Sequence, residues 1–273
     1  MQFVESNGAR IPIIGFGSMR LKDEAGAAAI LSALRVGYRH LDTAAYYGNE
    51  REVGQAMRAS GVPREDIFLT TKVRDDKLKA DDFARSLDGS LKALDLPFVD
   101  LLLIHWPNPN VPMAESIGAL NKAKRDGLAR HIGVANYTVA LLDEAMMHTK
   151  EPLVTNQIEA HPFLDFSKIF TETRRYMLSI TAYCPIARGR VPGNPLLERI
   201  GAAHGKTASQ VSLRWLVQQG VIVIPGSSKP ERQKENFEVL DFNLTPSEMA
   251  EIDGLKSAGV RVVNPPQAPK WDA

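Results

Sequence analysis

Short apolar runs alternate with longer amphipathic segments along most of this chain. Several runs are apolar at consecutive positions, and Val99-Asp100-Leu101-Leu102-Leu103-Ile104 is the clearest of them. Continuous apolar runs are typical of parallel strands that helices cover on both faces. The pattern therefore predicts strands over residues 13–16, 40–42, 68–71, 99–104, 131–134, 155–158, 180–183 and 221–224.

Helical spacing fills the intervals between these runs. In segment 80–94, apolar side chains recur so that they share one helix face. Thr245-Pro246 offers a threonine cap followed by proline at the first helical position, which is a favourable helix start. We expect the main helices over residues 23–36, 80–94, 207–219 and 246–257.

About eight strand–helix units predict an α/β protein with a (β/α)8 TIM barrel. Residues 3–5 and 9–11 flank Asn7-Gly8, which favours a tight β-hairpin before the barrel. A short proline-rich tail follows the barrel, and nothing in residues 1–273 suggests a second domain. The alternative is a doubly wound open sheet, but Gly15-Phe16-Gly17-Ser18 carries only part of a dinucleotide-binding glycine motif.

Charge and cysteine content narrow the classes of function. The 273 residues include 33 basic and 32 acidic side chains, so no long-range field attracts nucleic acid or an anionic membrane. A lone cysteine, Cys184, excludes an internal disulfide and fits a reducing cytoplasm. We expect a cytoplasmic protein, because the first residues resemble no signal peptide and no apolar run reaches the ~18 residues of a membrane span. The six histidines show no metal-ligand spacing, so we expect no metal.

Four side chains that can carry chemistry fall near the carboxyl ends of the expected strands, where barrel active sites lie. Asp42, Lys72 and His105 follow or end the second, third and fourth strands, and Tyr47 lies in the loop after Asp42. Each alone has a structural explanation as a helix cap, a solvated charge or a packed ring. Together on one rim they favour catalysis, since ionised groups at apolar strand ends are otherwise costly.

The chemistry of these four residues is coherent. An ammonium on Lys72, held by Asp42, would lower the pKa of the Tyr47 phenol, which is about 10 in free tyrosine. Tyr47 could then donate a proton to a carbonyl oxygen while a hydride reaches the carbon, and neutral His105 could orient the same oxygen.

The segment GYRHLDTAAYYGNE, residues 37–50, resembles the long signature of the aldo-keto reductases. The resemblance implies that Asp42 and Tyr47 are catalytic, and residues 71–73 and 103–107 match the segments that carry the lysine and the histidine. Residues 133–137 and 156–162 match the segments that hold a nicotinamide carboxamide, and Tyr183 matches the aromatic ring that stacks on it. Overall length, short loops and a Trp-Asp near the C-terminus look most like the bacterial 2,5-diketo-gluconate and methylglyoxal reductases within this family.

A phosphate site is expected after the eighth strand. Residues 226–232 offer a glycine turn, two hydroxyls and two cations before a helix that starts at Pro230, and a helix N-terminus suits phosphate. A basic surface turn is the alternative. Arg188 and Arg190 either approach the diphosphate or are solvated. With the resemblance included, the predicted cofactor contacts are Gly17, Ser18, Asn136, Gln157, Tyr183, Ser227, Ser228, Lys229, Arg232 and Asn236.

Two positions depart from the family pattern. Gly226 stands where a lysine is common, and Ala135 replaces a serine that bonds the carboxamide. We expect NADPH as the preferred cofactor, because Ser228, Lys229 and Arg232 can compensate, with use of NADH as the alternative.

The expected substrate is a small carbonyl compound, such as a dicarbonyl or a keto sugar acid. The resemblance and the rim positions place Met19, Tyr46 and Trp106 at the pocket mouth, and short loops predict an open pocket. We expect a monomer. Two rival classes stay open: a cofactor-sensing subunit of a membrane channel, and a lyase or isomerase that uses Lys72 to form a Schiff base.

Overall fold

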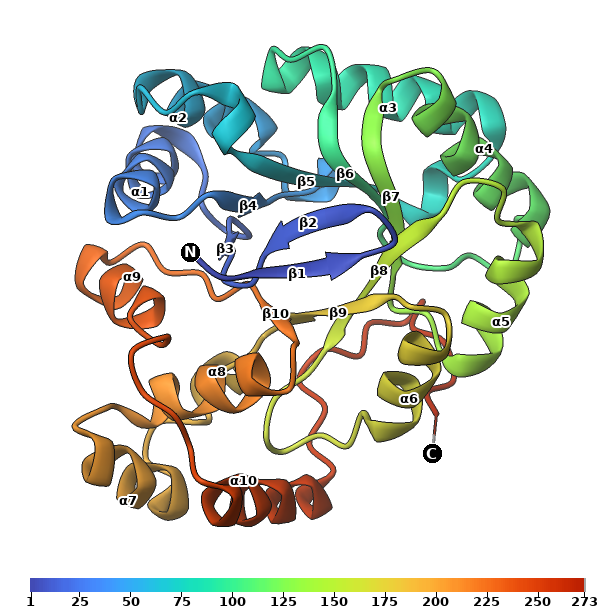
Figure 1. Cartoon of the computed structure of the whole chain (residues 1–273). Helices are drawn as coiled ribbons and strands as arrows, with labels where there is room; N and C mark the ends of the chain where they lie inside the picture. Colours follow the sequence, from blue (N-terminus) through green and yellow to red (C-terminus); the bar gives the residue numbers. More distant parts are fainter. Residues whose placement is uncertain (273) are drawn as a thin grey trace.

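Eight parallel strands form a barrel at the centre of the computed structural model, which describes residues 1–272 (Figure 1). Each strand pairs in parallel with the next along the chain. The first and last strands meet where Ile14 bridges Val223 and the Gly15 amide donates to the Val223 carbonyl at 2.8 Å. The predicted barrel is confirmed and the open sheet is wrong. The strands are β3 (Phe16–Gly17), β4 (His40–Asp42), β5 (Phe68–Val73), β6 (Val99–Ile104), β7 (Ala129–Ala135), β8 (Leu153–Glu159), β9 (Ser179–Tyr183) and β10 (Ile222–Val223).

Helices surround the strands on the outside of the barrel (Figure 1). The expected helices over residues 23–36 and 80–94 occur with those bounds. The segment expected as one helix over residues 246–257 instead changes to a 3-10 turn at Gly254. The helices are α1 (Asp23–Val36), α2 (Glu50–Ala59), α3 (Ala80–Leu94), α4 (Met113–Arg125), α5 (Val139–His148), α6 (Ser167–Arg175), α7 (Pro195–His204), α8 (Ala208–Gln218), α9 (Pro230–Phe237) and α10 (Pro246–Asp253).

The N-terminal hairpin covers one end of the barrel. It consists of β1 (Phe3–Ser6) and β2 (Ala9–Pro12), and its turn residues Asn7 and Gly8 both have positive φ, as a primed turn requires. Its turn is tied to the amino end of β8, because the Ser6 hydroxyl donates to the Val154 carbonyl at 2.6 Å. Ile11 is fully buried against the barrel interior. Chemistry is therefore confined to the opposite end, where the strands finish.

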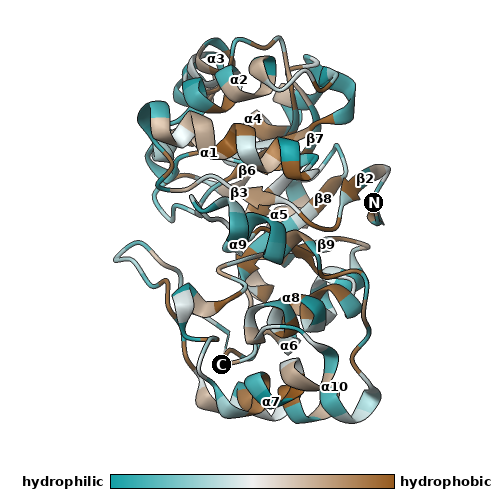
Figure 2. Cartoon of the chain, turned by 90° about the vertical axis from the view of Figure 1, so that its left-hand side faces the viewer, coloured by the Kyte–Doolittle hydropathy of each residue, from teal (hydrophilic) through white to brown (hydrophobic). Residues whose placement is uncertain are grey.

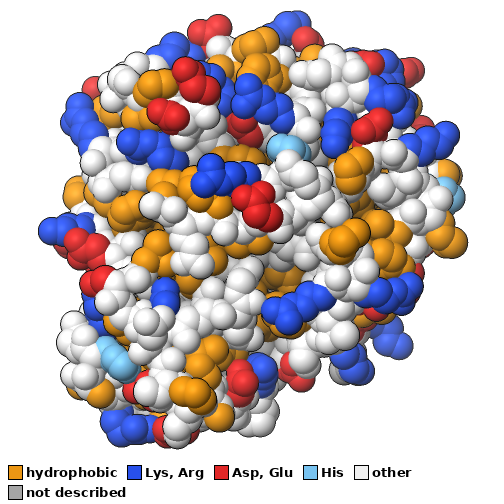
Figure 3. Space-filling model, viewed as in Figure 1, with side chains coloured by type: hydrophobic (Ala, Val, Ile, Leu, Met, Phe, Trp, Pro, Cys, Tyr) orange, Lys and Arg blue, Asp and Glu red, His pale blue; other side chains and the backbone are white. Residues whose placement is uncertain are grey.

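Apolar residues concentrate on the strands and on the helix faces that meet them (Figure 2). All six residues of β6 are buried, as the continuous apolar run predicted. Charged side chains of both signs are interspersed over the face that carries the hairpin (Figure 3), in keeping with the near-zero net charge. In the described residues 1–272, no helix has the length and apolarity to cross a membrane.

Candidate active site

The four predicted catalytic residues come from adjacent strand ends. Asp42 ends β4, Lys72 lies near the end of β5 and His105 directly follows β6. Tyr47 ends a short 3-10 turn over Ala45–Tyr47, which follows β4. Because the strands are parallel, their carboxyl ends share one rim, and the structure brings these four residues together there.

Lys72 and Asp42 form a buried ion pair below this rim. The Lys72 ammonium donates to Asp42 Oδ1 at 2.5 Å and to the Thr43 carbonyl at 2.8 Å, and the Lys72 side chain is fully buried. Gln157, which lies on β8, donates its amide N–H to Asp42 Oδ2 at 2.7 Å. Both carboxylate oxygens are therefore occupied, and the ammonium is fixed in position. The sequence assigned Gln157 only to the cofactor and missed this contact.

Tyr47 lies beside the ion pair. Lys72 Nζ is 5.2 Å from the centroid of the Tyr47 ring. Burial raises the pKa of Tyr47 well above its ordinary value, and the Asp42 charge raises that pKa further. The net direction is opposite to the lowering that the sequence predicted, because burial is the largest influence on this pKa. Tyr47 therefore stays protonated at ordinary pH, as a proton donor must.

His105 packs against the same tyrosine. The two ring centroids are 5.7 Å apart and the rings are nearly perpendicular at 81°. Burial lowers the pKa of His105 to about 3, and the cations Lys72 and Arg74 contribute to the lowering. The imidazole is therefore neutral near pH 7, as the sequence predicted, and it can hydrogen-bond a carbonyl oxygen without carrying charge.

Asn136 and Tyr183 are connected to this group across the rim. The Asn136 amide donates to the His105 carbonyl at 2.9 Å and accepts from the Tyr183 hydroxyl at 2.7 Å. Asn136 has φ of 64°, a conformation that asparagine tolerates better than most residues. Asn136 therefore contacts His105, and Tyr183, a second predicted nicotinamide contact, is linked to it through Asn136.

The predicted phosphate loop presents its polar groups to solvent. Ser228, Lys229 and Arg232 are exposed and Ser227 is half-buried, while Asn236 is buried in α9. No side chain caps the start of α9. Exposed hydroxyls and cations at an uncapped helix N-terminus fit the phosphate groups of a dinucleotide.

Ser18 and Gly17, which the sequence assigned to the cofactor, also contact other parts of the protein. The Ser18 hydroxyl is buried and donates to the Asp42 carbonyl at 2.9 Å, so it supports the catalytic strand end. A Cβ at Gly226 would lie 2.3 Å from the Gly17 carbonyl oxygen. The close approach of these two loops gives the physical reason for glycine at a position where the family commonly has lysine.

The predicted substrate residues differ in their exposure. Met19 and Tyr46 are exposed, and the Tyr46 ring centroid is 6.1 Å from that of His105. Trp106 is buried because the C-terminal tail covers it, and its ring centroid is 6.0 Å from that of Trp271. The tail therefore packs against a residue predicted for the pocket mouth, a contact that the sequence did not indicate.

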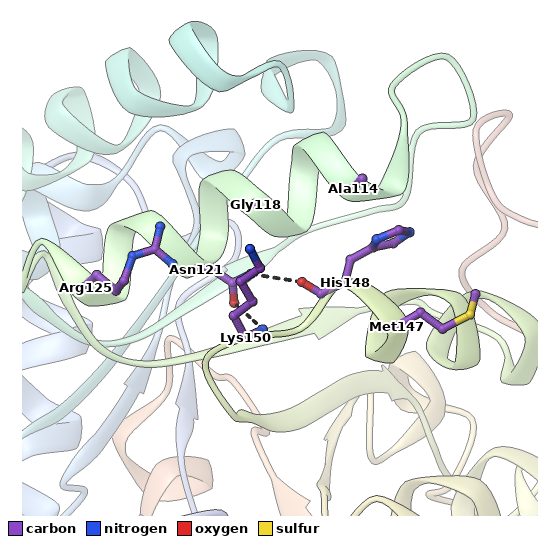
Figure 4. A pocket seen from close by; sticks show the side chains of 7 residues that line it. All are labelled: Ala114, Gly118, Asn121, Arg125, Met147, His148 and Lys150. Atoms are coloured by element: carbon purple, nitrogen blue, oxygen red, sulfur yellow. Dashed lines mark hydrogen bonds between the residues drawn. The ribbon is translucent and has the colours of Figure 1, made fainter.

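A hollow of about 290 Å³ lies elsewhere, between α4 and α5 (Figure 4). Asn121 crosses its floor and bonds the His148 carbonyl and the Lys150 amide. This hollow is on the outer helical layer and holds no acid, so we assign the chemistry to the rim. Within residues 1–272, no group of three or more His, Cys, Asp or Glu side chains could hold a metal ion.

Known proteins share this sequence and this arrangement. The sequence profile of the Aldo/keto reductase family matches residues 13–257. Methylglyoxal reductase DkgB of Escherichia coli O157:H7 is 39% identical over 96% of this chain and 99% of its own. A crystal structure whose assigned name is 2,5-diketo-D-gluconic acid reductase B superposes with a TM-score of 0.95 at 49% identity, over 100% of this chain and 98% of that one.

A Bombyx mori aldo-keto reductase, solved in complex with NADP, superposes with a TM-score of 0.89 at 32% identity, over 96% of this chain and 95% of that one. The extent of the profile match and the identity to full-length relatives agree with the strand-end site. This chain therefore belongs to the aldo/keto reductase family and is an oxidoreductase that acts on carbonyl groups.

Proposed function

We propose that this protein reduces small aldehydes and ketones, including dicarbonyls and keto sugar acids, with NADPH as the hydride donor and Tyr47 as the proton donor. The observation that carries the proposal is the buried Asp42–Lys72 pair beside Tyr47. The relatives named for methylglyoxal and diketogluconate support the substrate class. We further propose that it acts as a cytoplasmic monomer built from one domain.

Each residue has a defined part in this proposal. A bound reduced nicotinamide supplies the hydride, and the residues that would hold it are Asn136, Gln157 and Tyr183. Tyr47 gives its phenolic proton to the carbonyl oxygen, and neutral His105 orients that oxygen by a hydrogen bond. The ammonium of Lys72 stabilises the negative charge that develops on the phenol as its proton leaves.

The direct test replaces Tyr47 with phenylalanine. We expect Tyr47→Phe to lower kcat for methylglyoxal reduction by about 10² to 10⁴, the usual contribution of a general acid. Affinity for NADPH, measured by fluorescence titration, should stay within about twofold, because a hydroxyl is lost without changing the ring. Tyr176→Phe is the matched control, since Tyr176 precedes β9 at the opposite end of the barrel and its hydroxyl donates to Asp143. Near wild-type kcat in Tyr47→Phe would refute the mechanism.

Cofactor preference is tested at α9. Arg232→Ala should raise KM for NADPH about tenfold and leave KM for NADH unchanged, because only NADPH carries a 2′-phosphate for arginine to grip. Lys234→Ala on the same helix is the control, since Lys234 lies near Glu238. Equal changes in KM for NADPH and NADH would show that Arg232 does not bind the 2′-phosphate.

A further inference from the structure

The C-terminal tail is bound to the barrel by a buried carboxylate. Glu159 is the last residue of β8, and its side chain is fully buried. Its two oxygens accept the backbone amides of Val262 at 2.6 Å and Val263 at 2.8 Å. His161 Nε2 lies 3.0 Å from Oε1 of the same carboxylate. Glu159 therefore connects the barrel interior with a segment more than one hundred residues later.

The position of Glu159 places the tail above the catalytic residues. Side chains two residues apart on a strand share a face, so Glu159 lies on the same face as Gln157. Gln157 bonds Asp42 inside the barrel. Glu159 is one layer closer to the carboxyl ends of the strands, and the tail that it binds lies at that end of the barrel.

A second contact fixes the end of the tail. The carboxylate of Asp272 accepts the Val139 amide at 3.1 Å, at the first residue of α5. Between the two attachments the tail folds back on itself, because Trp271 Nε1 donates to Asn264 Oδ1 at 2.9 Å. The Arg261 guanidinium lies 3.8 Å from the centroid of the Trp271 ring. These contacts place Trp271 against Trp106, the residue after His105.

The first attachment is a strong one. A buried carboxylate is costly unless hydrogen bonds replace its water, and bonds to a charged acceptor are about twice as strong as neutral ones. Two of the three partners of Glu159 belong to the tail. If the tail lifted, the carboxylate would lose both, so its burial favours the closed arrangement.

We propose that Glu159 is a positioning residue for carbonyl reduction: it fixes the tail so that Trp271 and Arg261 form the outer wall of the substrate site. The inference rests on the proposed function, which places the substrate at Tyr47 and His105. A small dicarbonyl reaches Tyr47 without touching this wall, whereas a larger aldehyde must pack against it. Glu159 therefore controls KM for large substrates and leaves kcat unchanged.

The kinetic test compares methylglyoxal with 2-naphthaldehyde in Glu159→Gln, which keeps the shape but removes the charge. We expect KM for 2-naphthaldehyde to rise about tenfold, a loss of about 1.4 kcal/mol of binding, with kcat within about twofold. Both constants for methylglyoxal should stay within about twofold. Glu172→Gln, a carboxylate of α6 that pairs with Arg175, is the matched control and should change neither substrate. Equal KM changes for the two substrates would overturn the proposal.

A truncated chain that ends at Val260 shows whether Glu159 acts through the tail. In that background Glu159→Gln should have no further effect on KM for 2-naphthaldehyde, because the two changes remove the same wall. An undiminished tenfold effect there would mean that Glu159 acts in another way. If either variant fails to fold, Asp272→Asn can be used instead, because it weakens the exposed attachment of the tail to α5. It should raise KM for 2-naphthaldehyde by about two- to threefold, and an unchanged KM would contradict the proposal that the tail contacts large substrates.

The rate of trypsin cleavage measures how readily the tail detaches from the barrel, independently of reductase activity. The peptide bond after Arg261 contains the Val262 amide that Glu159 binds. We expect cleavage at this bond to be about tenfold faster in Glu159→Gln than in the wild type or Glu172→Gln, since opening of the tail limits cleavage. An unchanged cleavage rate would refute the anchoring role. Anchoring with no reductase activity in the wild type would instead refute the proposed function.

Discussion

Removing the charge of Asp42 tests the central feature of the site. Asp42→Asn preserves the shape of the side chain, and its amide oxygen can still accept from Lys72. Its amide nitrogen then faces the Gln157 nitrogen, so Gln157 has to flip and present its oxygen instead. Hydrogen bonding can be restored, but the ammonium of fully buried Lys72 has lost its counter-charge. The substitution therefore isolates charge from geometry.

The energetic cost of removing the Asp42 charge can be worked out from the distance between Asp42 and Lys72. Two unit charges 2.5 Å apart attract by about 7 kcal/mol at an effective dielectric constant of about 20. Breaking a buried pair by removing one partner costs about 3–5 kcal/mol after relaxation. Burial already lowers the pKa of Lys72 and Asp42 opposes that lowering, so the variant should lower this pKa further.

Urea unfolding and steady-state kinetics measure the two consequences. We expect the free energy of unfolding of Asp42→Asn at pH 7 to fall by about 3–5 kcal/mol. Because the pKa of Lys72 is then lower in the folded than in the unfolded chain, the unfolded state binds more protons, and stability should recover as pH rises from 6 to 9. The kcat should fall, since a neutral Lys72 cannot stabilise charge on Tyr47.

The double variant Asp42→Asn/Lys72→Met provides the control. It removes both charges, so its stability should lie within about 1–2 kcal/mol of the wild type while it stays inactive. The reasoning is refuted if Asp42→Asn loses less than about 1 kcal/mol, or if the double variant is no more stable than the single one.

Two further substitutions test the barrel itself. Gly226→Ala forces a Cβ to within 2.3 Å of the Gly17 carbonyl oxygen, so the free energy of unfolding, measured by urea titration, should fall by about 1–3 kcal/mol and NADPH affinity should weaken. Gly89→Ala, on an open face of α3, is the control and should leave the free energy of unfolding unchanged or raise it. Burial lowers the pKa of His40 from 6.5 to about 4, so the unfolded chain takes up a proton first, and stability is lost as pH falls below 6.5. His40 should account for about 2 kcal/mol of the stability lost between pH 7 and pH 5, and the pH dependence of His40→Gln should be smaller by that amount; an identical pH dependence would contradict the assignment.

The hydrophobic pattern predicted the barrel because the residues of each strand and the helix after it determine that strand–helix unit locally. It predicted strands that are too short where polar residues enter the interior. Strand β8 runs Leu153–Glu159, beyond the expected 155–158, and its last residue is the buried carboxylate Glu159, which lies past the apolar run. The first strand is shifted to Phe16–Gly17, since its partner at the seam is set by residues near 223. Such pairings depend on the whole chain.

The grouping of Asp42, Tyr47, Lys72 and His105 could be predicted because strand ends and a shared rim follow from the topology alone. The direction of the Tyr47 pKa could not, because it depends mainly on how deeply the phenol is buried. The docking of the tail was also missed, since Glu159 and Val262 are 103 positions apart. An acidic residue at the end of a buried strand was the available signal, because its burial requires a partner.

The seam between β3 and β10 has a consequence for how the protein folds. Val223 donates to the Ile13 carbonyl and accepts from Gly15, so the barrel closes only when β10 meets a segment far earlier in the chain. Contacts of such long sequence separation are slow to form, and the barrel stays an open sheet until this pairing is made. The loops on either side of this seam, at Gly17 and Gly226, are those that we propose hold the cofactor. A cofactor that bridges them would close the newly made sheet and draw the folding equilibrium toward the finished barrel.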